Sequence, residues 1–189
     1  ATFSGDQMNT SHQITVTNVR LSYVKVFGEG EINKSGKRLW SLTALVRKDS
    51  PQIIAITEAI NAAKAKDVEK VGKTGIKSPL LDGDAKDDDG EYKYGTPEHR
   101  GCYLLRCVNY KRRPTAVDQS VQPIIDPEQL YSGCYGNVRI SFYGYNSGTN
   151  KGISPGIESV QKVRDGERLG NGPADPSELF TSVEDDFLS

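Results

Sequence analysis

The sequence has no long hydrophobic run, few histidines and few cysteines, and each scarcity excludes a class of protein. No apolar stretch approaches the roughly 20 residues of a membrane-spanning helix, and no signal-peptide pattern stands near the start. The three cysteines are an odd number without a secretory signal, which favours a reducing compartment over a disulfide framework. With only His12 and His99 present, histidine-based catalysis is disfavoured.

The cysteine spacing also argues against a zinc site. Four residues separate Cys102 from Cys107, and Cys134 stands alone. Together the three cysteines do not form a tetrahedral zinc pattern. We therefore expect three buried, apolar thiols.

Two short patterns resemble loops that bind phosphate or calcium, and both fail on spacing. The segment Gly72-Lys73-Thr74 resembles the end of a phosphate-binding loop, but Asp67 stands where its first glycine is needed. The acidic run from 82 to 91 lacks EF-hand spacing, because position 86 is lysine. We expect no catalytic residue, no metal and no cofactor, with a metal-dependent nuclease using residues 82–89 as an alternative.

Charge is divided unevenly along the chain. Residues 1–168 hold 24 basic and 20 acidic side chains, whereas the whole chain has a net charge of −1. No lysine or arginine follows Arg168, and the acidic residues beyond it are Asp175, Glu178, Glu184, Asp185 and Asp186. The pattern favours a body that binds a polyanion and a tail that binds something else. The alternative is a tail that only aids solubility.

Alternating apolar residues and turn formers predict an OB-fold-like, five-stranded β-barrel with one inserted α-helix. The expected strands are 14–23, with a bulge near Asn18, and 38–46, 102–110, 137–145 and 157–164. Loops are expected at 28–37, 72–101 and 146–156. The domain is expected over 13–168, between a flexible segment 1–12 and a flexible, disordered acidic tail 169–189. Residues before Met8 receive no functional weight.

The predicted helix begins at Ser50 as N-cap with Pro51 at its first position and runs to about Val71. An isoleucine recurs every three or four residues along it, which places one apolar face on the barrel. The members of this face are Ile53, Ile56 and Ile60.

The strand 138–145 separates its side chains cleanly by direction. Val138, Ile140 and Phe142 share the phase expected to face the core. The opposite phase carries Arg139, Ser141, Tyr143 and Tyr145. A cation beside two tyrosines is typical of a platform for stacked bases and a phosphate. The alternative is that both tyrosines lie beneath the helix or a loop.

Basic and aromatic residues are also interleaved at the end of the strand before it. This second set consists of Arg106, Tyr110, Lys111, Arg112 and Arg113. Further candidates for contact with a single strand are Tyr23, Phe27, Trp40 and Lys151, with a core position as the alternative for Trp40. The pattern suits an exposed, charged backbone with accessible bases.

Several blocks resemble one bacteriophage family, which was first catalogued as a domain of unknown function and is similar to phage single-stranded-DNA-binding proteins. The blocks are 20–23, 111–114, 122–127, 131–135, 141–146, 150–153 and 160–170. The resemblance implies an OB-fold, binding of single-stranded DNA in replication, recombination or repair, no catalysis, and the cytoplasm of an infected bacterium.

The acidic ending is similar to the tails of bacterial and phage single-strand-binding proteins. That resemblance implies that Glu184, Asp185, Asp186 and Phe187 recruit replication or recombination proteins and can compete with DNA. No membrane contact is expected, and a homo-oligomer is left open. The alternative function is a phage structural or assembly protein with a tyrosine-rich protein interface.

Overall fold

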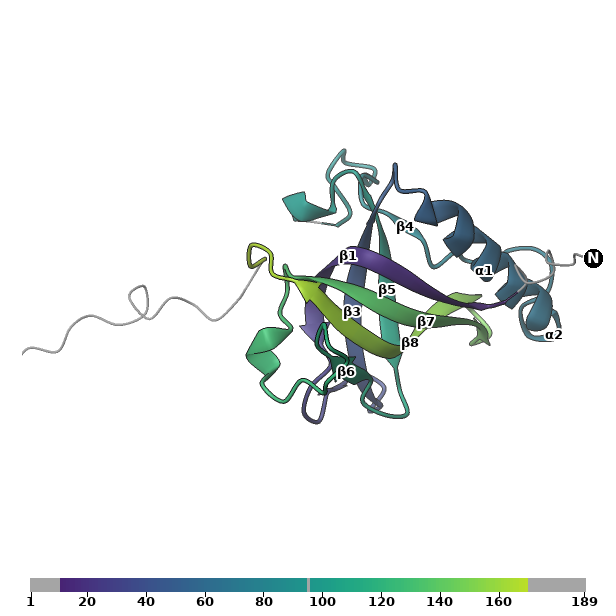
Figure 1. The fold of residues 1–189 in the computed structure, drawn as a ribbon. Helices are drawn as coiled ribbons and strands as arrows, with labels where there is room; N and C mark the ends of the chain where they lie inside the picture. Colours follow the sequence, from purple (N-terminus) through teal and green to yellow (C-terminus); the bar gives the residue numbers. More distant parts are fainter. Residues whose placement is uncertain (1–10, 95, 170–189) are drawn as a thin grey trace, which may run out of the picture.

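The computed structural model describes residues 11–94 and 96–169, which form a closed barrel of five main strands (Figure 1). These strands are β1 (Gln13–Lys25), β3 (Arg38–Arg47), β5 (Cys102–Asn109), β7 (Tyr135–Asn146) and β8 (Lys151–Arg164). Their hydrogen-bonded order runs β1-β3-β5-β8-β7 and returns to β1. Closure removes every free edge of the main sheet, and the mainly β, OB-fold-like prediction is confirmed.

The barrel interior follows the alternation read from β7. Val138, Ile140 and Phe142 are each 0% exposed and lie in the main core, whereas Arg139 and Tyr143 lie on the outer face. The bulge expected near Asn18 is also present, as a register shift between Val16 and Val19. The predicted direction of the β7 side chains is therefore confirmed.

Helix α1 (Gln52–Lys66) packs across one end of the barrel against β1, β7 and β8 (Figure 1). Ile56 and Ile60 are buried and Ile53 packs beside them, as the isoleucine spacing predicts. The helix begins one residue later than predicted, with Pro51 and not Ser50 at the N-cap. The Ser50 hydroxyl still accepts a hydrogen bond from the N–H of Gln52 at 3.2 Å, just before the helix.

The expectation of one continuous helix to Val71 is wrong. The chain leaves helical geometry at Asp67 and resumes in the short α2 (Val68–Val71), which ends at Gly72. The cause is tertiary, because the Asp67 carboxylate turns to accept a hydrogen bond from β7.

The expected loop over 146–156 is also mostly wrong, because β8 begins at Lys151. Pro155 lies inside this strand, opposite Phe142 of β7. On its other side β8 pairs with β5 only at Gly156. The missing N–H of the proline therefore interrupts no regular ladder there.

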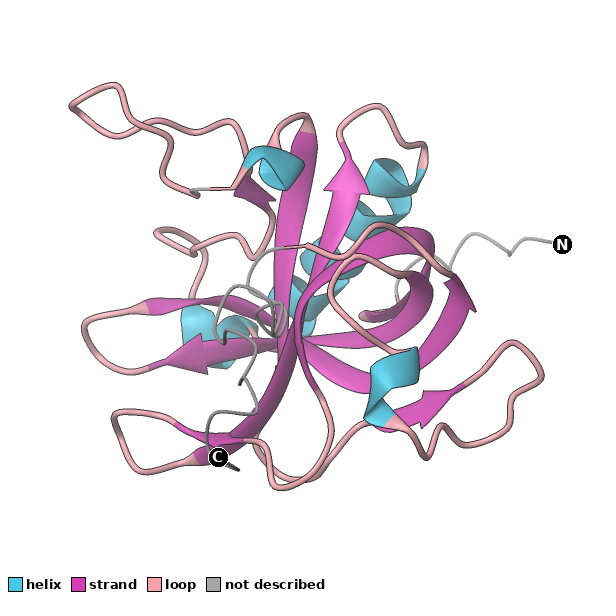
Figure 2. Ribbon diagram, turned by 90° about the vertical axis from the view of Figure 1, so that its left-hand side faces the viewer, coloured by secondary structure: helices cyan, strands magenta, loops and turns pink. Residues whose placement is uncertain are grey.

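Three short strands absent from the sequence reading flank the barrel, and its loops extend outward from the strand ends (Figure 2). They are β2 (Glu31–Ile32), β4 (Leu81–Asp82) and β6 (Thr115–Val117). Two short 3-10 helices also occur, η2 (Pro97–His99) and η3 (Pro127–Gln129). Each of these elements is only two or three residues long, too short to show a periodicity.

The segment 72–101 does more than cover the surface. Leu81 and Tyr94 pack on the outer face of β3 and β5, against Leu45, Cys102 and Leu104. This second cluster fixes the segment to the barrel and positions the residues that follow Tyr94.

All three cysteines are buried and free, as predicted. Within the described ranges, no helix is long and apolar enough to cross a membrane.

Candidate nucleic-acid interface

Tyr23 occupies a strained position near the end of β1. The register between β1 and β3 shifts between Ser22 and Lys25, which marks a β-bulge. Tyr23 has a φ of 48°, a backbone region that bulky side chains rarely adopt, and 50% of the residue is exposed. Bulges re-aim side chains, and such strain concentrates at functional positions. The bulge thus turns this ring outward.

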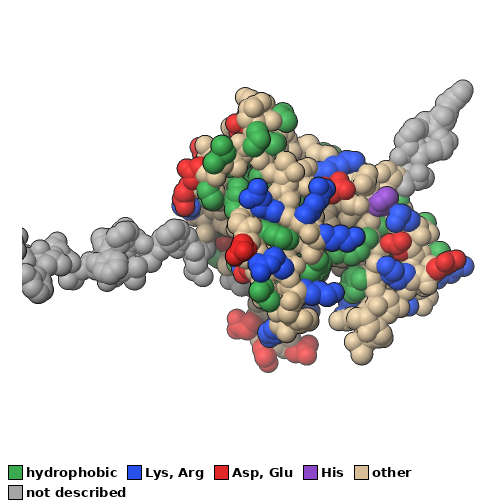
Figure 3. Space-filling view, turned by 90° about the horizontal axis from the view of Figure 1, so that it is seen from below, with side chains coloured by type: hydrophobic (Ala, Val, Ile, Leu, Met, Phe, Trp, Pro, Cys, Tyr) green, Lys and Arg blue, Asp and Glu red, His purple; other side chains and the backbone are tan. Residues whose placement is uncertain are grey.

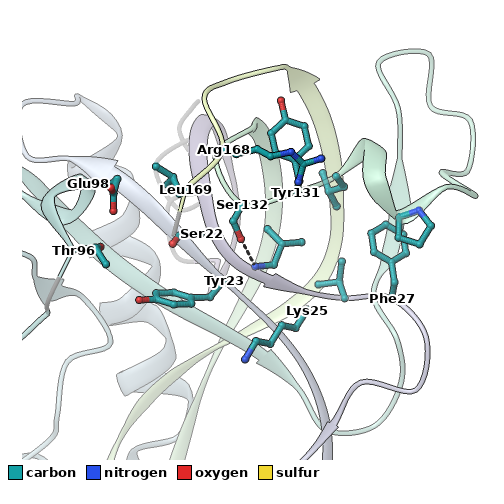
Figure 4. Close-up of a pocket in the computed structure, with 14 residues that line it drawn as sticks. Ser22, Tyr23, Lys25, Phe27, Thr96, Glu98, Tyr131, Ser132, Arg168 and Leu169 are labelled. Atoms are coloured by element: carbon teal, nitrogen blue, oxygen red, sulfur yellow. Dashed lines mark hydrogen bonds between the residues drawn. The ribbon is translucent and has the colours of Figure 1, made fainter. Parts of the chain in front are cut away.

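Tyr23 forms one wall of a hollow of about 560 Å³, named the Phe27 hollow after a residue of the same wall (Figure 4). The opposite wall comes from residues 127–132, from Glu98 and from Arg168. The hydroxyl of Ser132 accepts a hydrogen bond from the N–H of Val24 at 3.1 Å and ties the two walls together. Arg168 lies over the Tyr131 ring, 4.4 Å from its centroid.

The other side of Tyr23 faces a second hollow of about 400 Å³, named the Arg106 hollow. Its floor comes from the outer faces of β3 and β5, and its rim carries Lys93, Tyr94 and His99. The Arg106 guanidinium lies 5.0 Å from the centroid of the Tyr94 ring. Tyr23 and His99 lie 6.1 Å apart between ring centroids, at 50°. Aromatic rings and cations therefore surround both hollows, with Tyr23 between them.

His99 is neutral at pH 7, because burial lowers the pKa of its imidazole. The ring is 2% exposed, and neither nitrogen makes a hydrogen bond of normal geometry to the described residues. The main chain of Tyr94 raises the pKa of the imidazole, but by less than burial lowers it. The wall of the Arg106 hollow thus includes a buried, neutral imidazole.

A basic turn follows β5 at the end of the barrel. The Asn109 side-chain oxygen accepts hydrogen bonds from the N–H groups of Lys111 at 2.9 Å and Arg112 at 3.0 Å. The Asn109 amide donates to the Ile157 carbonyl at 2.9 Å, which anchors the turn to β8. Lys111, Arg112 and Arg113 are all exposed. Viewed from this end, lysine and arginine side chains gather across the surface (Figure 3).

Tyr110 brings the basic turn close to β7. Burial raises the pKa of its phenol, and the nearby phenol of Tyr143 raises it further. The Lys37 ammonium lies 5.8 Å from the Tyr110 ring centroid. The Tyr143 ring lies against Gly156, where a Cβ atom would stand 3.2 Å from it. Tyr110 and Tyr143 are therefore neighbours beside a cationic turn.

The remaining sequence candidates lie apart from the two hollows. Arg139 donates to Thr15 at 3.3 Å and lies 3.8 Å from Glu158. Tyr145 places its hydroxyl over Gly152, and Lys151 lies beside Gly72 near α2. The Trp40 indole N–H donates to the Gly28 carbonyl at 3.1 Å, so the half-buried ring supports the loop 28–30.

The structure therefore brings Tyr23, Phe27 and Arg106 to the hollows and Tyr110, Lys111, Arg112 and Arg113 to a separate basic turn. The tail residues Glu184, Asp185, Asp186 and Phe187 lie outside the described residues.

Several lining residues of the two hollows were not predicted from the sequence, in part because residues 72–101 were expected to form a surface loop. The lining residues that were not predicted as DNA contacts include Lys25, Lys93, Tyr94, His99, Tyr131 and Arg168. The available signal was Tyr92 and Tyr94, two aromatic residues at the end of an otherwise acidic loop.

The acidic residues between 82 and 91 make ion pairs and hydrogen bonds within the protein. Asp82 and Asp84 lie 2.6 Å and 2.8 Å from the Lys48 ammonium, which lowers the pKa of both carboxyls. Asp87 accepts from the N–H groups of Asp89 at 2.9 Å and Glu91 at 3.0 Å within a turn. Across 11–94 and 96–169, no three histidine, cysteine or acidic side chains cluster to hold a metal. The geometry therefore gives the nuclease alternative no support.

Comparison with known proteins places these features in a family. The family described as "Enterobacter phage Enc34, ssDNA-binding protein" matches residues 12–188. A putative protein p50 of Acyrthosiphon pisum secondary endosymbiont phage 1 is 30% identical over 182 residues, covering 90% of this chain and 94% of its own.

Solved structures share the fold. The single-stranded DNA-binding protein from bacteriophage Enc34, in complex with ssDNA, superposes with a TM-score of 0.70 at 24% identity, covering 84% of this chain and 90% of its own. The gp2.5 single-stranded DNA binding protein of bacteriophage T7 has a TM-score of 0.55 at 15% identity, covering 86% and 95%. At these identities the likeness establishes the barrel architecture.

Proposed function

The chain belongs to the family of the Enterobacter phage Enc34 single-stranded-DNA-binding protein, and from this premise we propose that it binds single-stranded DNA with little sequence preference. The strand crosses the Phe27 and Arg106 hollows with Tyr23 between them. Tyr110 and Tyr143 beside the basic turn extend the contact surface.

The position of Tyr23 is the observation that carries the proposal. An outward aromatic ring held at a φ of 48° between two hollows offers a face on which a base can stack. Stacking on an aromatic side chain contributes about 1–3 kcal/mol per base and is tolerant of sequence. Phe27 on the same wall and Tyr131 on the opposite wall offer rings for the neighbouring base.

The charge around the hollows suits the phosphates. Lys25, Lys93, Arg106 and Arg168 line them, with Glu98 as the opposing carboxylate. Each phosphate contact on a single strand releases counterions. The logarithm of the binding constant therefore falls with the logarithm of the salt concentration, with a slope of about 0.7 per contact. The exposed basic turn adds to this positive surface.

We further propose that the protein acts in phage DNA replication, recombination or repair, in the cytoplasm of the bacterial host. The acidic residues Glu184, Asp185 and Asp186, with Phe187, recruit a partner protein from these processes. Acidic groups can occupy cationic surfaces, and the aromatic ring gives a partner pocket an apolar anchor.

The test is an anisotropy titration of the full chain with fluorescent oligo-dT. Tyr23→Ala is expected to weaken binding about 10-fold or more through the lost stacking. Tyr23→Phe is the matched control and keeps near-native affinity, because it retains the ring. Equal affinity of Tyr23→Ala and the native chain would refute binding across the Phe27 and Arg106 hollows. A native chain that does not bind oligo-dT would favour the phage assembly alternative instead.

A further inference from the structure

A third hollow, of about 340 Å³, is lined by four arginines and is named the arginine hollow: Arg20, Arg47, Arg100 and Arg164. It lies where the bulge of β1, the end of β3, the start of β7 and the end of β8 meet. None of its four arginines was among the residues that the sequence predicts to contact DNA. Its volume and its lining differ from those of the two aromatic hollows.

The four guanidiniums bring more charge than their neighbours neutralise. Arg20 donates to the main-chain carbonyls of Gly133 at 3.2 Å and Glu167 at 2.7 Å. Arg100 donates to the carbonyls of Gly83 and Tyr94. Carbonyl acceptors are neutral, so these hydrogen bonds hold both side chains in place without cancelling their charge. For Arg100, the Asp84 carboxylate is an additional, charged neighbour.

The carboxylates near the hollow are few. Glu98 is the acidic side chain in its lining, set against four arginines. Asp49 approaches Arg47 at 3.5 Å, but both side chains are more than two-thirds exposed. Ion pairs that exposed contribute little and are screened by salt. An anion entering the hollow therefore meets a net positive field.

Tyr135 fixes two of the guanidiniums and defines the kind of ligand. Arg164 stacks on its ring at 3.6 Å from the centroid, and Arg20 lies 5.8 Å from the same centroid. A stacked guanidinium is pre-organised, and its planar fork matches the oxygens of a phosphate. Because arginine already covers the ring, the hollow suits an anion rather than a base.

The arginine hollow and the Phe27 hollow have one lining residue in common. Glu98 lines both of them. Along β1, Arg20 precedes Tyr23 by three residues, or about 10 Å of strand. A short stretch of extended single strand covers this span.

We propose that the arginine hollow binds phosphates of the DNA strand that leaves the Phe27 hollow, and so lengthens the binding site beyond the stacked bases. The inference rests on the proposed binding of single-stranded DNA. It assigns Arg47 and Arg164 as direct phosphate contacts and Arg20 and Arg100 as the fixed cations behind them.

The test compares short and long oligo-dT on the full chain. An oligonucleotide of about 4 nucleotides covers the hollows around Tyr23, whereas one of about 16 reaches the arginines. The double variant Arg47→Gln/Arg164→Gln is expected to bind the short strand as the native chain does. It is expected to bind the long strand about 10-fold more weakly, with a salt slope smaller by about 1.4 for two lost phosphates.

The matched control is Lys64→Gln/Lys73→Gln, which removes the same charge at the far end of α1 and just after α2. It is expected to bind the long strand with native affinity. Arg47→Lys/Arg164→Lys is expected to restore most of the salt slope, because it retains both charges.

Three outcomes would overturn the inference. They are unchanged binding of the long strand, equal loss in the lysine control, and tighter binding of the long strand by the arginine variant. The last would mean that the arginines hold a competing acidic segment rather than DNA. The proposed function fails separately, through loss of all binding or indifference to Tyr23→Ala.

Discussion

The Asp67 carboxylate accepts a hydrogen bond of 2.6 Å from the main-chain N–H of Gly144, and this contact joins the break between α1 and α2 to β7. A Cβ at Gly144 would stand 2.9 Å from the Asp67 Cβ and 2.8 Å from Val71, so only glycine permits the approach. The hydrogen bond is the main reason why the pKa of Asp67 lies below its usual value of 3.8.

A carboxyl whose pKa is depressed in the folded state stabilises the fold above its unfolded pKa. That contribution is lost as pH falls through the lower, folded pKa. Asp67→Ala is expected to lower the free energy of unfolding by about 2 kcal/mol at pH 7. Asp67→Asn, which keeps a neutral acceptor, is expected to lose about half as much.

Urea unfolding between pH 7 and pH 2.5 checks this prediction. The difference between the native chain and Asp67→Asn is expected to be constant above about pH 5 and to shrink below about pH 4. A difference that does not change with pH would contradict the charge-assisted bond.

The outer face of β7 provides the second prediction. If Arg139 and Tyr143 contact DNA as the strand alternation suggests, Arg139→Ala/Tyr143→Ala is expected to weaken oligo-dT binding about 10-fold. Tyr145→Ala serves as a comparison on the same strand, because the Tyr145 hydroxyl lies over Gly152. Unchanged binding by the double variant would show that the β7 face does not contact DNA. It would not affect the proposal for the Phe27 and Arg106 hollows.

The basic turn provides the third. Replacing Lys111, Arg112 and Arg113 by glutamine is expected to reduce the salt slope by up to about 2, since three phosphate contacts are lost. Asn109→Ala keeps those charges but frees the turn, so affinity should fall a few-fold with the slope preserved. Titrations at several salt concentrations separate the two effects. Identical slopes in all three proteins would show that the turn does not contact phosphate.

Thiol reactivity provides the fourth. Burial raises the pKa of Cys102, Cys107 and Cys134, so little thiolate is present at pH 7. Ellman's reagent is expected to react slowly with the native chain. In guanidinium, which unfolds the chain, it is expected to react rapidly with all three thiols. Cys102, at 6% exposure the least buried, is expected to react first. A thiol that reacts at once in the native chain would contradict the core packing.

The fifth prediction concerns the acidic ending. Deleting residues 175–189 is expected to preserve or strengthen binding to oligo-dT, since five carboxylates are removed from a chain with a basic body. Capture of replication proteins from infected-cell extract is expected to be lost with the deletion. A clear fall in DNA affinity after truncation would contradict both roles.

Local patterns were enough to predict the barrel. The alternation through Phe142 and the spacing of Ile56 and Ile60 fixed which faces are buried, because each depends on neighbours in the chain. The break at Asp67 was missed because its cause is a bond to Gly144, 77 residues away. The early start of β8 was missed because glycine and proline are poor strand formers.

The candidate interface was only partly predictable for the same reason. Tyr23 was identifiable as an aromatic residue near the end of a strand, but its outward turn depends on a bulge against β3. The Phe27 hollow exists because residues 96–98 and 127–132 fold against that bulge. Such walls form only through distant contacts, which periodicity does not record.

The two ends of the described chain lie on different parts of the barrel. The carbonyl of His12 accepts a hydrogen bond from Phe142 at 2.9 Å on β7, whereas Leu169 lines the Phe27 hollow. A surface tether or fluorophore placed ahead of residue 12 therefore starts beside β7 and away from the Phe27 hollow. A label on Leu169 itself would lie in the wall of that hollow and report directly on its occupancy.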